Sequence, residues 1–97
     1  MNAMIHEQTI TGTTQSGFHY TLDQKSLDNM ELLDALSDAT GDNPLAVSNV
    51  CKLMLGNEQR KALYDHVRAD DGRVPVDAVS AELIEMFGAF GTAGKNS

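Results

Sequence analysis

Residues 53–75, LMLGNEQRKALYDHVRADDGRVP, decide how this chain folds. Gly56 can take the left-handed conformation that ends a helix, and Asn57 behind it can cap the next one. Leu63 and Val67 lie four residues apart, which gives the second helix an apolar side facing a core. The stretch therefore predicts the end of one helix, a glycine stop and a second full helix.

A charged turn then leads into the last helix. Asp70, Asp71 and Gly72 form a strong turn signal, and we expect the helix to begin between Pro75 and Asp77. Its apolar residues share one arc of a helical wheel, the strongest amphipathic pattern in the chain: Val79, Leu83, Met86, Phe87 and Phe90. We expect the glycines from residue 88 onward to erode this helix.

The N-terminal part predicts a β-hairpin. Phe18, Tyr20 and Leu22 alternate with polar residues, a period of two that is typical of a half-buried strand. Threonine-rich sequence precedes them, and 15–17 (QSG) can turn the chain. Residues 8–22 are therefore expected to form two short strands that lean on the helices.

Two more helices are expected between the hairpin and Gly56. Ser26 or Asp28 can cap the first, which should end near Ala39. One of its sides is acidic, with Glu31, Asp34 and Asp38 in a row opposite the apolar residues. Pro44 is suited to the first turn of the second helix, whose core face is Ala46, Val47, Val50, Leu53 and Met54.

These elements predict a mainly α protein: a compact bundle of four short helices with a small N-terminal β-hairpin. We expect one domain over residues 1–97, with a loose start at 1–7, the hairpin at 8–22, a helical region at 26–91 and a mobile tail at 92–97.

Composition excludes several kinds of partner. The net charge is −7, and residues 1–50 hold one basic and seven acidic residues. Such a surface repels phosphate backbones and anionic membranes, so we expect no nucleic-acid or membrane binding. No charged-then-apolar leader or membrane-length apolar run is present, so we expect the protein to stay in the compartment where it is made. The single cysteine, Cys51, falls on an apolar helix side and is expected to be a small buried hydrophobe.

The sequence offers no constellation that supports catalysis. His6, His19 and His66 are scattered without metal-ligand spacing, and no second cysteine accompanies Cys51. Asp70 and Asp71 lack the oxygen-rich pattern of a calcium loop. We therefore predict no catalytic residue, cofactor or metal, and we do not expect an enzyme.

Two surfaces are candidates for binding another protein. The acidic row is either a docking face for a basic partner helix or, more simply, a solvated helix side. The apolar side of the last helix is either core or an exposed groove, and four short helices leave some apolar surface uncovered. The candidate partner-binding residues are Glu31, Asp34, Asp38, Leu83, Met86, Phe87 and Phe90.

Several segments carry a family resemblance through their order and spacing. They are Gly17-Phe18, Leu27 to Leu33 (LDNMELL), Leu55-Gly56, Leu63 to Arg68 (LYDHVR), Asp71 to Val76 (DGRVPV), Glu82, Met86-Phe87 and Gly94 to Ser97 (GKNS). Together they resemble the small tail assembly chaperones of long-tailed, siphovirus-like phages and prophages, especially those of Gram-positive hosts. The likeness covers residues 10–97.

The resemblance implies non-enzymatic work during virion assembly in the host cytoplasm. Members of this family bind the long, helical tape measure protein, keep it soluble and help tail tube subunits polymerise around it, and they are not retained in the virion. Many also have a longer frameshifted form. A homo-oligomer is a further expectation, because an unfilled groove tends to find a like surface. Two alternatives stay open: a structural tail or neck component retained in the virion, and an acidic inhibitor that mimics nucleic acid.

Overall fold

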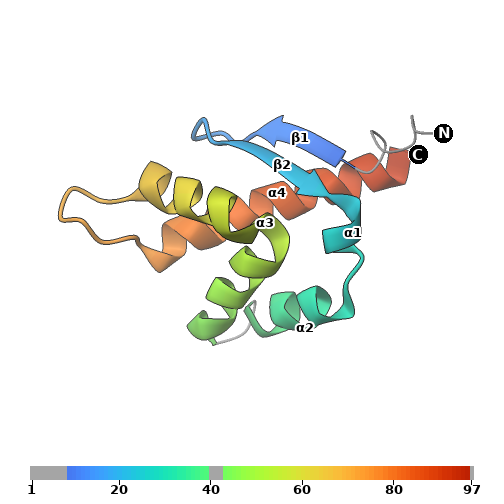
Figure 1. Cartoon of the computed structure of the whole chain (residues 1–97), viewed down its shortest axis with the longest axis horizontal. Coiled ribbons are helices and arrows are strands. Elements are labelled where there is room, and N and C mark those ends of the chain that lie inside the picture. Colours follow the sequence, from blue (N-terminus) through green and yellow to red (C-terminus); the bar gives the residue numbers. More distant parts are fainter. Residues whose placement is uncertain (1–8, 40–42, 97) are drawn as a thin grey trace.

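The structure is a computed structural model that describes the backbone of residues 9–39 and 43–96, with side chains up to residue 89. Among these residues it confirms the mainly helical fold, with a two-stranded antiparallel hairpin and four helices (Figure 1). The elements are β1 (Thr9–Thr13), β2 (His19–Asp23), α1 (Gln24–Leu27), α2 (Met30–Ala39), α3 (Pro44–Val67) and α4 (Val76–Asn96). The expected loose start at 1–7 lies outside the described residues.

The hairpin forms as the alternation predicts. Phe18, Tyr20 and Leu22 are buried, and the residues between them are exposed. Tyr20 pairs with Gly12 in the antiparallel register. A Cβ atom on Gly12 would lie only 2.5 Å from the Tyr20 hydroxyl, so the ring needs a residue without a side chain there.

A side chain from α3 covers the outer edge of β2. Nε2 of Gln59 donates to the Thr21 carbonyl and its Oε1 accepts from the Thr21 N–H, both at 2.7 Å. Nε2 also lies 3.2 Å from the Leu55 carbonyl. The amide thus takes the place of a neighbouring strand at the middle of β2, which ties the hairpin to α3.

The helix predicted to end near Ala39 is α2, but it begins only at Met30, and an additional short helix, α1, precedes it. Asp23 caps α1, because its Oδ1 accepts from the Lys25 N–H at 3.0 Å. Asn29 then accepts from the Glu31 N–H at 3.0 Å, at the start of α2. Two side chains that bond nearby backbone groups thus begin two helices where one was expected. Of the residues that follow α2, 40–42 lie outside the described part of the chain.

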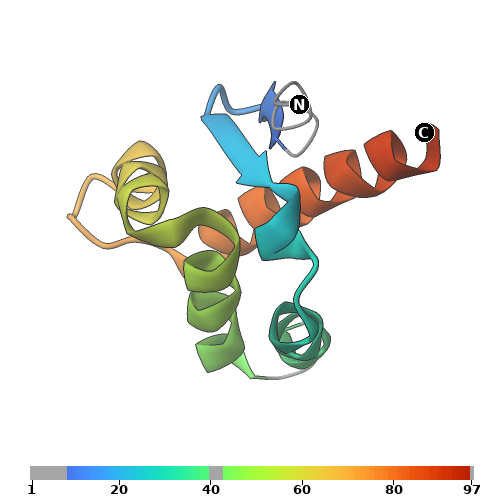
Figure 2. The same cartoon turned by 45° about the vertical axis from the view of Figure 1, so that its right-hand side comes forward.

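The two helices predicted around Gly56 are the two arms of α3. Pro44 lies in the first turn of the first arm, as expected, and Asn43 is its cap. Gly56 has φ 77° and ψ 178°, a conformation that breaks the helix and turns the second arm away from the first (Figures 1 and 2). The side chain of Asn57 accepts from the Arg60 guanidinium at 3.1 Å, instead of from the backbone N–H that a cap would use. The predicted glycine stop is confirmed, and its result is an elbow.

The predicted turn between α3 and α4 is closed by its own hydrogen bonds. Ala69 N–H donates to the Arg73 carbonyl at 2.8 Å, and Gly72 N–H donates to the Ala69 carbonyl at 2.9 Å. The side chain and backbone of Arg73 both bond Asp71, which holds the pKa of that carboxyl below its usual value. α4 then runs to Asn96, so the glycines do not end it near residue 91.

The core lies between the hairpin, α2, the two arms of α3 and α4. Its fully buried members are Leu22, Leu32, Leu63, Met86, Val50 and Cys51. Of the two interpretations of the amphipathic side of α4, core is the one the structure supports for Val79, Leu83 and Met86. Cys51 is the small buried hydrophobe expected from its position.

Burial of Cys51 gives a prediction that also reports whether the chain is folded. Burial raises the pKa of the Cys51 thiol to about 11, against the opposing effects of the Arg60 charge and a hydrogen bond with Tyr64. We expect no labelling by a thiol reagent near neutral pH until the chain unfolds, because only the thiolate reacts. Stability should fall as pH rises from 9 toward 11, since the unfolded thiol ionises first.

Urea titrations across this pH range test the expectation, with Cys51→Ala as the control. This variant lacks the thiol, so its stability should fall less steeply with pH than that of the natural chain. Equal slopes for the two proteins, or rapid labelling of the folded chain, would contradict the burial of Cys51.

Candidate partner-binding surface

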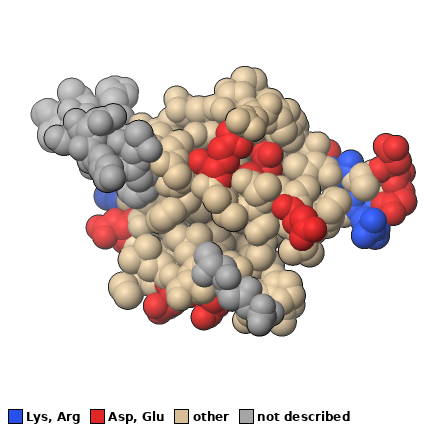
Figure 3. Space-filling model, turned by 180° about the vertical axis from the view of Figure 1, so that it is seen from behind, with Lys and Arg blue, Asp and Glu red and all other residues tan. Residues whose placement is uncertain are grey.

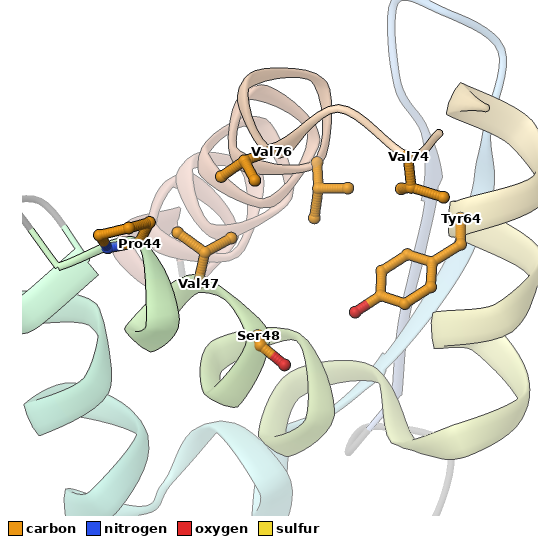
Figure 4. A pocket seen from close by; sticks show the side chains of 7 residues that line it. Pro44, Val47, Ser48, Tyr64, Val74 and Val76 are labelled. Atoms are coloured by element: carbon orange, nitrogen blue, oxygen red, sulfur yellow. The ribbon is translucent and has the colours of Figure 1, made fainter. Parts of the chain in front are cut away.

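The two arms of α3 and the start of α4 line an open apolar pocket, called here the elbow pocket (Figure 4). Its volume is about 260 Å³, and α4 closes its far side. It is lined by Pro44, Val47, Ser48, Tyr64, Val74, Val76 and Val79. The Tyr64 hydroxyl points into it from the second arm of α3, Ser48 lines it from the first arm, and the other lining side chains are apolar (Figure 4). Such a mixture suits an apolar side chain with one or two polar contacts.

Large apolar side chains are exposed beside this pocket. Val76, in its lining, is 51% exposed, and Leu45, in the first turn of α3, is 80% exposed. An exposed leucine alone is ordinary, but Val76 lines the hollow and Leu45 directly follows Pro44, which also lines it, so exposed apolar residues adjoin the pocket. This continuity makes the elbow pocket the best candidate for a contact with another protein.

The predicted acidic row lines a second hollow, called here the acidic groove, between α2 and the first arm of α3. Its volume is about 300 Å³. It is lined by Glu31, Asp34, Ala35, Asp38, Asn49 and Leu53. The three acidic side chains therefore lie opposite Asn49 and Leu53 of α3, although they remain exposed to solvent.

A third hollow, of about 50 Å³, lies where α2, α3 and α4 meet. Val47 lines both this hollow and the elbow pocket. Ile84, on the α4 side of the hollow, is 65% exposed, and Leu33 on α2 is 44% exposed. This hollow is too small to hold a large side chain, and Ile84 does not line the elbow pocket.

The α4 residues predicted to bind a partner differ in how exposed their side chains are. Leu83 and Met86 are 3% and 0% exposed, so in this fold they cannot contact another protein. Phe87 is half-buried against the core. The side chain of Phe90 lies outside the described residues. Among the described side chains of α4, the large apolar ones that are exposed are instead Val76 and Ile84.

A polar cluster at the hairpin turn joins three elements. Ser16 Oγ donates to Oε2 of Glu82 on α4 at 2.9 Å and lies 3.0 Å from Nε2 of His66 on α3. The His66 ring also packs against Phe18, with centroids 5.5 Å apart. Glu85 of α4 accepts from the Gln15 N–H at 2.9 Å.

This cluster contains a hydroxyl, an imidazole and a carboxylate, but not in a catalytic order. Nucleophilic catalysis needs the carboxylate to orient the imidazole, whereas here Glu82 bonds the hydroxyl of Ser16. Glu82 is also 7% exposed, and its Oε1 has no hydrogen-bond partner. Its position is best explained as an attachment of the hairpin turn to α4. The burial of Glu82 was not predicted from the sequence, because acidic residues are expected in water.

The charged side chains are unevenly distributed over the molecule. On the face shown in Figure 3, acidic side chains are widely spread, including along the lower edge, and the basic side chains in view lie near its two ends. Between Lys25 and Lys52 the sequence contains no Lys or Arg at all. The charged side chains of α2 are therefore all acidic, and the first arm of α3 carries a single charge, that of Lys52.

Within the described residues, no group of three or more His, Cys, Asp or Glu side chains is placed to hold a metal ion. None of the helices, over the same residues, is long and apolar enough to span a membrane. The chain matches no protein-family model, no curated protein sequence and no solved structure.

Proposed function

We propose that this protein is a non-enzymatic tail assembly chaperone that binds a phage tape measure protein in the host cytoplasm and keeps it soluble until tail tube subunits enclose it. The family resemblance of residues 10–97 suggests this role. The observation that carries it is the elbow pocket, an apolar hollow of about 260 Å³ with exposed Leu45 and Val76 beside it. A chaperone needs such a surface to cover apolar side chains of a long helical client.

The net charge of −7 supports the same role. A protein that exposes apolar surface risks association with its own copies, and like charge keeps the copies and their complexes dispersed. The acidic region around α2 lies beside the apolar surface, so the charge is concentrated where unwanted contacts would form.

Co-expression with the tape measure protein tests the proposal. We expect most of the tape measure protein in the soluble fraction with the natural chain, and most of it in the pellet without it. Leu45→Asp or Val76→Asp should each reduce the soluble fraction several-fold, because each places a charge on the exposed apolar surface. Ala81→Asp is the matched control, since it adds the same charge at an exposed position of α4 away from the pocket.

Equal solubility of the tape measure protein with and without this chain would refute the proposal. Mass spectrometry of purified tails adds a second test, because a chaperone should be absent from them. A stoichiometric amount of this chain in finished particles would favour the structural tail or neck component instead.

A further inference from the structure

We infer that the elbow pocket and the acidic groove form one docking surface, and that its occupant is a basic amphipathic helix. Such a helix has bulky apolar side chains on one side and Lys or Arg next to them. The inference rests on the proposed function, because it specifies the chemistry of the client segment that this protein binds.

The two hollows are neighbours on the first arm of α3. Ser48 lines the elbow pocket, and the next residue, Asn49, lines the acidic groove. Leu45 lies three residues before Ser48 and four before Asn49, so all three are on one side of the helix. Side chains at this spacing are about 5–6 Å apart, and they form a ridge between the hollows. A bound helix is about 10–12 Å across, so one helix lying on this ridge reaches both.

The ridge is suited to an apolar anchor. Leu45, at its crest, is 80% exposed, and neither neighbouring hollow buries it. A client helix that inserts one bulky side chain into the elbow pocket would also cover Leu45. Binding thus removes apolar surface from water on both partners, which is the main driving force for helix-in-groove recognition.

The acidic groove selects the charge of the occupant. Glu31, Asp34 and Asp38 are exposed, and the ion pairs between described side chains are elsewhere, at Asp65–Arg68 and Asp71–Arg73. The groove carboxylates thus have no basic partner within the described part of the chain. Lys or Arg beside the apolar anchor would supply one, and an acidic helix would be repelled.

A second copy of this chain is a poorer occupant. Each copy carries a net charge of −7, so bringing two acidic regions together is unfavourable. Two of its basic side chains, Arg68 and Arg73, are already in ion pairs of their own. The charge therefore favours a basic partner over self-association at this surface.

Two synthetic peptides of about 18 residues, long enough to form a helix, serve as probes. Both carry leucine and phenylalanine at helical spacing; one has lysine at the flanking positions and the other has glutamate. Fluorescence anisotropy with the full chain measures their affinities. We expect the lysine peptide to bind at least about tenfold more tightly, and its advantage to shrink as salt is raised from about 50 to about 200 mM.

Charge variants locate the site. Asp34→Lys should weaken binding of the lysine peptide by about tenfold, whereas Glu58→Lys, the same charge change at an exposed position on the second arm of α3, should have little effect. Lys52→Glu, one turn further along the ridge, should strengthen it. Leu45→Ser should weaken both peptides and Ile84→Ser neither. These positions are all exposed, and the Cys51 thiol reports whether each variant is folded.

Equal affinity for the two peptides overturns the inference, and so does binding that Asp34→Lys and Glu58→Lys weaken equally. These outcomes leave the proposed function standing if the natural chain still keeps the tape measure protein soluble. Conversely, selective binding of the lysine peptide without any effect on the tape measure protein would support the docking surface and refute the proposed client.

Discussion

Replacing Ser16 with alanine is expected to lower the free energy of unfolding by about 2 kcal/mol, even though Ser16 itself is exposed. Its hydroxyl donates the hydrogen bond to Oε2 of Glu82, whose other oxygen has no partner. Since Glu82 is 7% exposed, water cannot readily take the place of the hydroxyl. The variant thus leaves a buried carboxylate without a donor, and urea denaturation measures the loss.

A double-mutant cycle with Glu82→Leu identifies the cause. In the Glu82→Leu background no carboxylate needs a donor, so Ser16→Ala should cost less than half as much. The 3.2 Å hydrogen bond between His66 Nε2 and the Ser16 carbonyl oxygen does not depend on the Ser16 side chain, so both backgrounds retain it. Gln15→Ala is the neighbouring control, because Glu85 bonds the backbone of Gln15 and not its side chain. If Ser16→Ala costs the same with and without Glu82, the explanation fails.

Replacing Gly56 with alanine should destabilise the chain by about 1–3 kcal/mol and disrupt the elbow pocket. At φ 77° and ψ 178°, the backbone of Gly56 is in a region that residues with a side chain hardly adopt. No atom lies within 4 Å of the position that an added Cβ would take, so the cost is conformational and does not come from a clash. Alanine favours a continuous helix, which would move Tyr64 away from Val47.

Gly88→Ala is the matched control for this variant. Gly88 also has nothing within 4 Å of an added Cβ, but it lies within helix α4. Alanine there should stabilise the chain by about 0.5–1 kcal/mol, because it is the better helix former. Denaturation curves of the two variants should therefore shift in opposite directions. A Gly56→Ala variant as stable as the natural chain, with the lysine peptide bound as before, would show that Gly56 does not set the bend.

Local sequence signals predicted most of the secondary structure. The period of two around Tyr20, the proline at residue 44 and the helix stop at Gly56 each depend on the chemistry of a few adjacent residues. The break between α1 and α2 was missed because Asp23 and Asn29 are both good caps, and the pattern around them also fits one longer helix. α4 passes its glycines, whose individual cost of about 1 kcal/mol is too small to end a helix.

The candidate site was only partly predictable. The spacing of Glu31, Asp34 and Asp38 on one helix placed them on one side, but Asn49 faces them only because α2 packs beside α3. Likewise, a glycine stop in the sequence does not give the angle between two helices, so the elbow pocket could not be foreseen. The arc of Leu83 and Met86 was identified, and its burial depended on how α4 lies against α3.

The amide of Gln59 limits edge-to-edge strand pairing between copies of this protein. It occupies the hydrogen-bonding groups of Thr21 on the outer side of β2, whereas no described strand pairs with the outer side of β1. If two hairpins paired through β1, the strand edges left for a further copy would both be β2 edges, on which Gln59 already occupies the Thr21 backbone. Further strand-to-strand growth from such a pair would have to displace Gln59, which disfavours a continuous fibre.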